Sequence, residues 1–328
     1  MTRDEAVLEF APIFAQKVDN EWLVADQIAP IDFAGSFKNV KENVEKLNGL
    51  DANDIDTIKP KIYYSVCETQ THFFIVYAVY HVIDWWKHVH PNNLYDLIRE
   101  RFDEHVHDME GAMFVVTKEH DPVRVDAVFT IAHNNFYLYA NPWTEKGKSK
   151  YLRIVKFNET VDGQIWRDDN GRVKLYIECK GHGMYGDWEK WGGGDAIWYY
   201  YPDHVNLPTD RLKSYEIGKG KNKQKMEEVK YKQYTLEDIC RDDGLWTFRF
   251  KDAVFKQTKS GKWGFVYRHD KTRRTFGGSA NPPWSWNDHN DTSPIGEIAT
   301  DPARFICRYA QGLGPVSPQY LYNPYLSI

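Results

Sequence analysis

The sequence predicts a mainly β protein, with a two-sheet β-sandwich as its core and helices at its periphery. Runs of β-branched and aromatic residues recur along the chain, and Gly, Asn, Asp and Pro turn residues lie between most of them. The chain lacks the regular strand–helix alternation of a parallel sheet covered by helices, so a sandwich is the expected architecture. With 328 residues, of which 42% are hydrophobic, we expect one domain spanning residues 1–328.

Seven segments have this strand composition. They cover residues 61–69, 72–82, 111–119, 124–133, 135–142, 173–183 and 195–202. The first two are separated by a very short connection, so they are expected to form a hairpin of two core strands. The sequence shows no internal repeat and no Pro- or Ser-rich linker, which supports a single domain.

Two stretches are expected to be helices packed outside the sandwich. Residues 40–56 are amphipathic, and the helical pattern ends at a Gly and an Asn/Asp loop. Residues 92–105 form the second predicted helix, for which Asn92 or Asn93 can serve as the N-terminal cap.

Residues 217–234, IGKGKNKQKMEEVKYKQY, are expected to form a lysine-rich loop inserted into the domain. The segment lacks apolar anchors, so we predict that it is solvated and mobile. The alternative is that its lysines contact an anionic surface such as lipid headgroups, which would be a peripheral membrane contact.

Composition narrows the classes of partner. The formal net charge of −5 argues against nucleic acid as a general partner. The sequence shows neither an apolar run long enough to cross a membrane nor a secretory signal at its start, so neither is expected. The four cysteines show no CxxC spacing, which excludes a zinc ribbon and favours free thiols in a reducing, cytoplasmic compartment. They are Cys67, Cys179, Cys240 and Cys307.

The stretch DEHVHDMEGAMFVV, residues 103–116, places acids and histidines at the mouth of an apolar strand. Because side chains alternate between faces, Asp108 and Glu110 share one face with the apolar residues that follow at even positions. Met109 and Gly111 lie on the other face, and His107 is expected to pack there too. His105 reaches the carboxylate face only if the chain bends around Val106.

Two neighbouring carboxylates that are half-buried cost several kcal/mol unless they are paired or bind a cation. A divalent cation is one interpretation of this stretch. The other is a polar strand entrance, with ion pairs to Arg101 or to a lysine. Further acids and imidazoles at strand ends favour one shared rim: Asp84, His133, and His182, which lies between two glycines that let backbone approach a ligand.

These motifs resemble a known family. VYAVYHVIDWW, EHVHDME and KGHG resemble segments of the necrosis-inducing cytolysins, also called necrosis- and ethylene-inducing-like proteins. The resemblance to their longer relatives, the vacuolar sorting-like proteins, is greater, and it includes the opening segment FAPIFAQKVDNEWLVADQI and the closing segment NPPWSWNDHNDTSPIGEIATDPARF. Tyr80 and Asp84 match a Tyr and an Asp of the family's first motif, and His182 resembles a later Gly-His-Gly histidine.

The resemblance implies a β-sandwich with a divalent cation at one end, which in the cytolysins serves recognition of a sphingolipid headgroup and membrane damage. It implies His105, His107, Asp108 and Glu110 as the counterparts of the family's His, His, Asp and Glu. The chain departs from the family pattern at three positions of this motif, where Glu104, Val106 and Met109 replace Gly, Arg and Trp, and these departures weigh against cytolysis.

We therefore predict a metal site formed by Asp84, His105, Asp108 and Glu110. This set has three carboxylates and one imidazole, and oxygen-rich sets favour Mg²⁺ or Ca²⁺, with Mn²⁺ as a further option. His133 and His182 are expected to be outer-shell or ligand-facing groups.

Two functions remain open. The first is recognition of a glycan, a glycolipid or a phosphate-containing small molecule, with tryptophans stacking on sugar rings: Trp188, Trp191, Trp284 and Trp286. The alternative is a metal-dependent hydrolase acting on a phosphate or glycosidic ester, with His182 or His107 as the general acid or base. No nucleophile motif such as GxSxG is present, so the binding function is favoured. Asp288 and Asp291 are interpreted as turn residues, and the alternative is that they form a wall of the same rim.

Overall fold

The computed structural model describes residues 1–20, 23–37, 42–50, 54–84, 105–141, 161–186, 194–209, 215–217, 224–226, 228–248, 255–257, 263–265, 281–289, 293–310 and 315–328. Twelve strands of this part of the chain form one mixed sheet. In sheet order they are β7 (Val161–Gly163), β6 (Asn135–Ala140), β5 (Arg124–Ala132), β4 (His105–Thr117), β3 (His72–Asp84), β2 (Lys61–Thr69), β13 (Glu228–Asp238), β10 (Ala196–Pro202), β1 (Ile13–Val18), β8 (Lys174–Ile177) and β9 (Met184–Tyr185), and β16 (Tyr320–Tyr322) pairs with β2.

Strands β2 to β6 form an antiparallel meander of consecutive strands, as their composition predicts. The predicted hairpin at residues 61–82 is confirmed as β2 and β3. The turn between β5 and β6 consists of His133 and Asn134, with φ values of 51° and 60°. Two successive left-handed residues are the geometry of a type I′ turn, which matches the twist of the strands that it joins.

The other half of the sheet is mixed. Strand β13 pairs in parallel with both β2 and β10, and β1 pairs in parallel with β8. This arrangement changes the interpretation of the lysine-rich segment, because residues 228–234 lie in β13 at the centre of the sheet. Residues 224–226 are β12 and pair with β11 (Tyr215–Ile217), so residues 217–234 are not one continuous loop. Residues 218–223 and 227 lie outside the described part.

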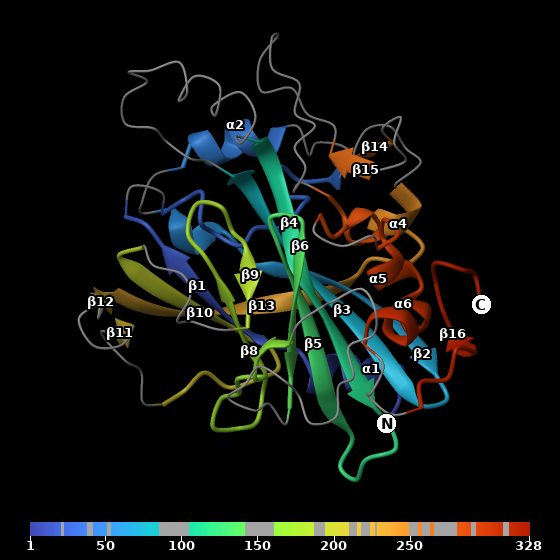
Figure 1. Ribbon diagram of the computed structural model, residues 1–328. Coiled ribbons are helices and arrows are strands. Elements are labelled where there is room, and N and C mark those ends of the chain that lie inside the picture. The colour runs from blue at the N-terminus through green and yellow to red at the C-terminus, as the bar shows by residue number, and fades with distance from the viewer. Residues whose placement is uncertain are drawn as a thin grey trace.

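The sheet curls on itself into a half-barrel, because β9 at one end returns to lie against β4 and β5 near the other end. Figure 1 shows β8 and β9 beside the long central strands. The mainly β class is thus confirmed, but a two-sheet sandwich is not. Parallel pairing through β13 joins strands that a sandwich would divide between two sheets.

Each face of the curled sheet packs in its own core. The concave face holds Phe114 and Trp198 together with other buried apolar side chains. The convex face is covered by α5 (Glu297–Thr300), α6 (Pro302–Tyr309) and η4 (Pro283–Ser285), as Figure 1 shows for the two helices. Phe305 of α6 contacts the rings of Phe129 and Phe136 edge-on, which anchors this helix on the sheet.

Trp284 and Trp286 belong to the convex core, at 5% and 2% exposure, so neither is available to stack on a sugar. The indole Nε1 of Trp286 donates to the carbonyl of Met109 at 3.0 Å. Gly111 makes this packing possible, because a Cβ there would lie 2.3 Å from the Tyr77 carbonyl oxygen and 2.7 Å from the Trp286 ring.

The first predicted helix is shorter than expected. In place of a helix over residues 40–56, the structure has α2 (Asn43–Asn48) and the 3₁₀ turn η2 (Ile55–Thr57). The N-terminus adds α1 (Arg3–Glu9), with Thr2 and Glu5 in a capping box, and α4 (Leu245–Phe248) follows β13. The small pair β14 (Phe255–Gln257) and β15 (Trp263–Phe265) stands apart from the main sheet. Residues 92–104 of the second predicted helix lie outside the described residues, and His105 begins β4.

In the described part of the chain, none of the helices is long and apolar enough to cross a membrane.

Candidate functional site

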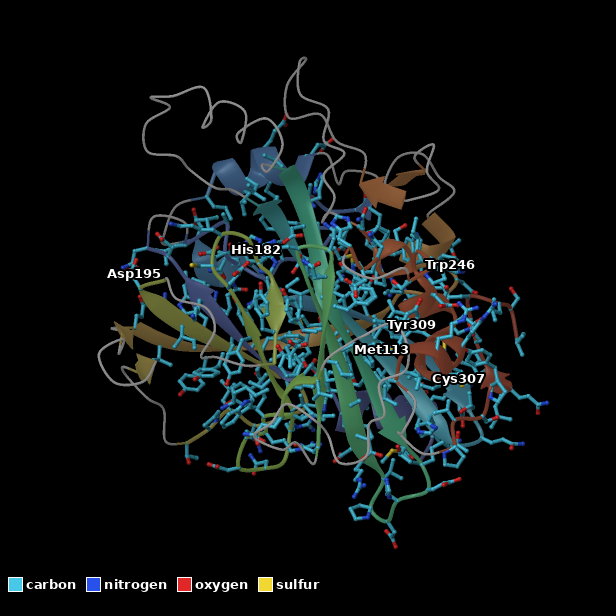
Figure 2. The ribbon with its side chains drawn as sticks, viewed as in Figure 1. Met113, His182, Asp195, Trp246, Cys307 and Tyr309 are labelled. Atoms are coloured by element: carbon cyan, nitrogen blue, oxygen red, sulfur yellow. The ribbon has the colours of Figure 1, made fainter. Side chains whose placement is uncertain are left out.

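A buried polar cluster lies on the concave face, where β3 and β4 meet the connection between β8 and β9. Strand pairing places His81 of β3 directly opposite Asp108 of β4. Directly opposed residues point to the same side of a sheet, so both side chains enter the concave core. His182 reaches the same point from the β8–β9 connection, and Figure 2 shows it beside these strands. Ligand atoms of the three side chains lie within 4.8 Å of one another.

The backbone around His182 explains the sequence KGHG. His182 itself has φ of 53° and Lys180 has φ of 69°, so the chain turns through two left-handed residues. The glycines on either side make room for neighbours: a Cβ on Gly181 would lie 2.8 Å from the His133 ring, and one on Gly183 would lie 2.8 Å from a Glu178 carboxylate oxygen. The tight connection therefore presents His182 to the concave face.

The imidazole of His182 lies between two carboxylates, and all three side chains are fully buried. Its Nε2 lies 3.2 Å from Asp26 Oδ1, and its Nδ1 lies 3.3 Å from Asp108 Oδ2. Burial alone would lower the pKa of His182, but the contacts with Asp108 and Asp26 outweigh it and raise the pKa to about 10. A charged imidazolium between two carboxylates therefore describes the metal-free cluster at neutral pH.

Asp26 and Asp108 differ in the hydrogen bonds that their carboxylate oxygens accept. Asp26 accepts backbone N–H groups from Lys180 at 2.7 Å and from Asp19 at 2.9 Å. Neither carboxylate oxygen of Asp108 accepts a hydrogen bond from any residue in the described part, because the contact with His182 lacks hydrogen-bond geometry. A buried ionised carboxylate without donors is costly, so Asp108 is the position at which an added cation would contribute most.

His81 is held as a neutral base. Its ring stacks on that of His182 with a centroid separation of 3.8 Å and an interplanar angle of 7°. Burial and the neighbouring His182 hold the pKa of His81 well below its ordinary value. Its Nε2 lies 2.9 Å from Gln16 Oε1, which supplies a hydrogen-bond acceptor.

Glu110 lies one step along the same face of β4 as Asp108, as the strand parity predicts. Its two oxygens accept the backbone N–H groups of His133 at 2.8 Å and of Met184 at 3.2 Å. Burial and the neighbouring Asp108 raise the pKa of Glu110 well above its ordinary value. Both oxygens are thus engaged, and Glu110 ties the β5–β6 turn and β9 to β4.

The other predicted site residues lie elsewhere. His107 packs on the convex face, where its Nδ1 lies 2.6 Å from the hydroxyl of Tyr80, so it is separated from Asp108 by the sheet. His133 lies at the rim, with its side chain 47% exposed and its Nε2 in contact with Glu178. Asp288 is buried at 5% exposure, whereas Asp291 lies outside the described residues, as do Trp188 and Trp191.

Asp84 and His105 pair with each other at the ends of β3 and β4. Their side chains lie outside the described part, so the predicted set of Asp84, His105, Asp108 and Glu110 stays a prediction. The sequence interpretation missed Gln16, Asp26 and His81. His81 could have been found by pairing 72–82 with 105–117 in register, since that pairing puts it opposite Asp108.

Comparison with known proteins returns solved structures alone. No family model matches the sequence, and no curated protein matches it. Necrosis and ethylene inducing protein 2 from the causal agent of cocoa's witches' broom disease is 19% identical, with a TM-score of 0.24 over 39% of this chain and 45% of that one. The non-toxic HaNLP3 protein is 15% identical, with a TM-score of 0.25 over 42% and 48%. NLPPya in complex with glucosamine is 13% identical, with a TM-score of 0.23 over 39% and 44%.

The chain thus spans less than half of the length of each of these structures. The structures are necrosis and ethylene inducing proteins, and this is the family that the sequence motifs resemble.

Proposed function

We propose that the chain recognises a glycan or a lipid headgroup through a divalent cation held by His81, Asp108 and His182. The observation that supports this function is the state of Asp108. It is a fully buried carboxylate with no hydrogen-bond donor in the described part of the chain, and it faces two imidazoles whose ligand atoms lie within 4.8 Å.

The donor chemistry fits a cation. Asp26 and Asp108 bring two carboxylates into a dry core, and Glu110 adds a third acidic group beside them. A divalent ion would offset their mutual repulsion more fully than the single charge on His182. Asp108 Oδ2 and His182 Nδ1 lie 3.3 Å apart, which suits two ligands of one tetrahedral ion, whereas the parallel stack of His81 on His182 would have to open for both rings to face that ion.

Three protein ligands leave coordination positions for an outside oxygen. Sugar hydroxyls and phosphate oxygens are suitable donors for a cation with open positions. His133, whose side chain is 47% exposed, and the partly buried Glu178 lie near the cluster, since a Cβ on Gly183, next to His182, would meet both side chains. This pair supplies hydrogen-bonding groups that a sugar approaching the cation would meet first.

The hydrolase alternative receives less support from the geometry. A general acid or base must come within hydrogen-bond distance of the substrate. His182 is fully buried between two carboxylates, and His107 lies on the opposite face of the sheet. Both ring nitrogens of His182 face carboxylates, and His107 cannot reach the cation from the other face of the sheet, so neither ring supplies a nitrogen to a substrate on the cation.

The test is metal-dependent ligand binding by the whole chain. Elemental analysis after exchange with divalent ions is expected to find one ion per chain. Calorimetric titration with a sugar panel that includes glucosamine, the ligand in one of the similar structures, and with glycolipid vesicles should show binding that a chelator abolishes.

Asp108→Asn should lose both the ion and the ligand. Asp126→Asn is the matched control, because Asp126 is a buried carboxylate that accepts hydrogen bonds from Thr117, His120 and Arg124 instead of facing this cluster. A wild-type chain that carries no stoichiometric ion, or binding that survives chelation, would reject the proposal.

A further inference from the structure

We infer that the cation site is a two-histidine, one-carboxylate site that selects a transition-metal ion such as Zn²⁺ over Mg²⁺ and Ca²⁺, with Gln16 and Asp26 as the residues that position its two imidazoles. The inference rests on the proposed cation site and narrows both the class of ion and the ligand atoms. It differs from the oxygen-rich Mg²⁺ or Ca²⁺ site that the sequence predicts.

Gln16 determines which nitrogen of His81 carries the proton. The Gln16 amide nitrogen donates to the carbonyl oxygens of Lys17 and Glu178, both at 3.0 Å. With its nitrogen held in this way, Gln16 presents its oxygen to His81 Nε2 at 2.9 Å. An amide oxygen only accepts, so Nε2 must donate, and the neutral ring then has its lone pair on Nδ1.

Asp26 likewise determines which nitrogen of His182 carries a proton. Both Asp26 oxygens are held by backbone N–H groups, from Lys180 and Asp19, and Oδ1 lies 3.2 Å from His182 Nε2. A carboxylate accepts, so Nε2 is again the donor. The remaining nitrogen, Nδ1, lies 3.3 Å from Asp108 and lacks a hydrogen-bond partner in the described residues.

Both positioning residues come from one short part of the chain, β1 and the loop that follows it. Gln16 and Asp26 are fully buried, as are the two imidazoles that they contact. Metal-binding histidines characteristically donate their second N–H to a carboxylate or a carbonyl oxygen, which sets ring orientation and ligand basicity. The contacts with Gln16 and Asp26 thus leave Nδ1 of each ring as the nitrogen that can bind an ion.

The donor set determines the class of ion. Two imidazole nitrogens and one carboxylate suit Zn²⁺ and neighbouring transition ions, whereas Mg²⁺ and Ca²⁺ require mostly oxygen ligands. Among the described residues, the close group of ligand atoms consists of His81, Asp108 and His182 and does not include Glu110. The described ligands therefore disfavour the hard cations.

The first experiment is a competition. Metal-free full-length protein is equilibrated with equal concentrations of Mg²⁺, Ca²⁺, Mn²⁺ and Zn²⁺, freed of unbound ions and analysed for its metal content. One Zn²⁺ per chain is expected, with little Mg²⁺ or Ca²⁺. Retention of Mg²⁺ or Ca²⁺ in place of Zn²⁺ would overturn this inference and leave the proposed function standing. Retention of no ion at all would reject both.

The second experiment identifies the ligand atoms. Long-range ¹H–¹⁵N spectra of the Zn²⁺-loaded chain should show His81 and His182 coordinated through Nδ1 with Nε2 protonated. Coordination through Nε2 of either ring would contradict the assigned positioning roles. This readout uses the wild-type protein, so it does not depend on any variant that fails to fold.

Two variants then test the positioning residues. Asp26→Asn removes the negative charge that faces His182 Nε2, and Gln16→Leu removes the acceptor that faces His81 Nε2. Each keeps the approximate side-chain size, and each should weaken Zn²⁺ affinity by about 10- to 100-fold. Asp126→Asn, the buried carboxylate at the other end of β5, should leave the affinity unchanged. Equal affinities for Asp26→Asn and wild type, with Asp26→Asn folded by circular dichroism, would show that Asp26 has no positioning role.

Discussion

His182 has an unusual charge state for a buried histidine. It has no solvent exposure, yet the two carboxylates beside it keep it protonated well above neutral pH. Removing one carboxylate would leave the other to hold the charge alone. Breaking a buried ion pair typically costs about 3–5 kcal/mol, so this cluster contributes to stability as well as to the proposed site.

We predict that the metal-free chain loses stability at alkaline pH. The folded-state pKa of His182, about 10, lies above its ordinary value of 6.5, so its contribution is complete below pH 6.5 and disappears as the pH rises through about 10. The unfolding free energy from urea titrations should fall by a few kcal/mol over this range. In Asp108→Asn the fall should be shallower. An identical fall in the variant would mean that other groups cause it.

Glu110 offers a second test at the scale of one residue. Glu110→Gln keeps the size of the side chain but replaces one accepting oxygen with a donor, which faces a backbone N–H of His133 or Met184. We expect a loss of about 1–3 kcal/mol in unfolding free energy, with metal stoichiometry unchanged. Loss of the ion from a folded variant would make Glu110 a metal ligand, as the family resemblance implies.

At the scale of elements, the connection between β8 and β9 delivers His182 to the sheet. Three contacts hold this connection in place. The Lys180 N–H donates to Asp26, the Met184 N–H donates to Glu110, and the carboxylate of Glu178 contacts the His133 ring. Gly183 allows these contacts, since any side chain there would meet Glu178 and the Tyr185 hydroxyl. The geometry of the connection therefore depends on one missing Cβ.

We predict that Gly183→Ala weakens both stability and the metal site. Its Cβ would lie 2.8 Å from a Glu178 carboxylate oxygen and 2.9 Å from the Tyr185 hydroxyl, so these side chains, which pack against the connection that carries His182, must shift. Thermal unfolding should occur at a lower temperature, and metal affinity should fall. Gly163→Ala is the control, because its Cβ would meet Tyr139 at 3.4 Å, an ordinary contact. Equal effects in both variants would argue against a specific role for this connection.

At the scale of the whole molecule, the curl of the sheet assembles the site. Gln16, Asp26, His81, Asp108 and His182 come from distant parts of the sequence and meet only because β9 returns to β4 and β5. A ligand that bridges them binds the folded chain and not the unfolded one. Its binding free energy therefore adds to the stability of the fold.

This coupling predicts a metal-dependent melting temperature. At a free Zn²⁺ concentration 100 times the dissociation constant, the stabilisation should be about 2.7 kcal/mol, and a chelator should reverse it. Differential scanning calorimetry of wild type with and without the ion measures the shift. Asp108→Asn should show almost none, and a shift of equal size in that variant would place the ion elsewhere.

The sequence by itself determined the features that depend on local geometry. Strand alternation has a period of two, so the carboxylate face of Asp108 and Glu110 and the opposite face of Met109 could be predicted from β4 alone. His107 was correctly assigned to the second face for the same reason. The positions of the main strands, and the mainly β class, also follow from local composition.

Only the tertiary structure decided which distant residues join Asp108. The register of β3 against β4 selects His81, and the curl of the sheet brings in Asp26 and Gln16, neither of which carries a local signal. The same non-local packing buries Trp284 and joins β13 to β2 in parallel. Such pairings depend on the free energy of the whole sheet, because each strand can satisfy its backbone hydrogen bonds with more than one neighbour.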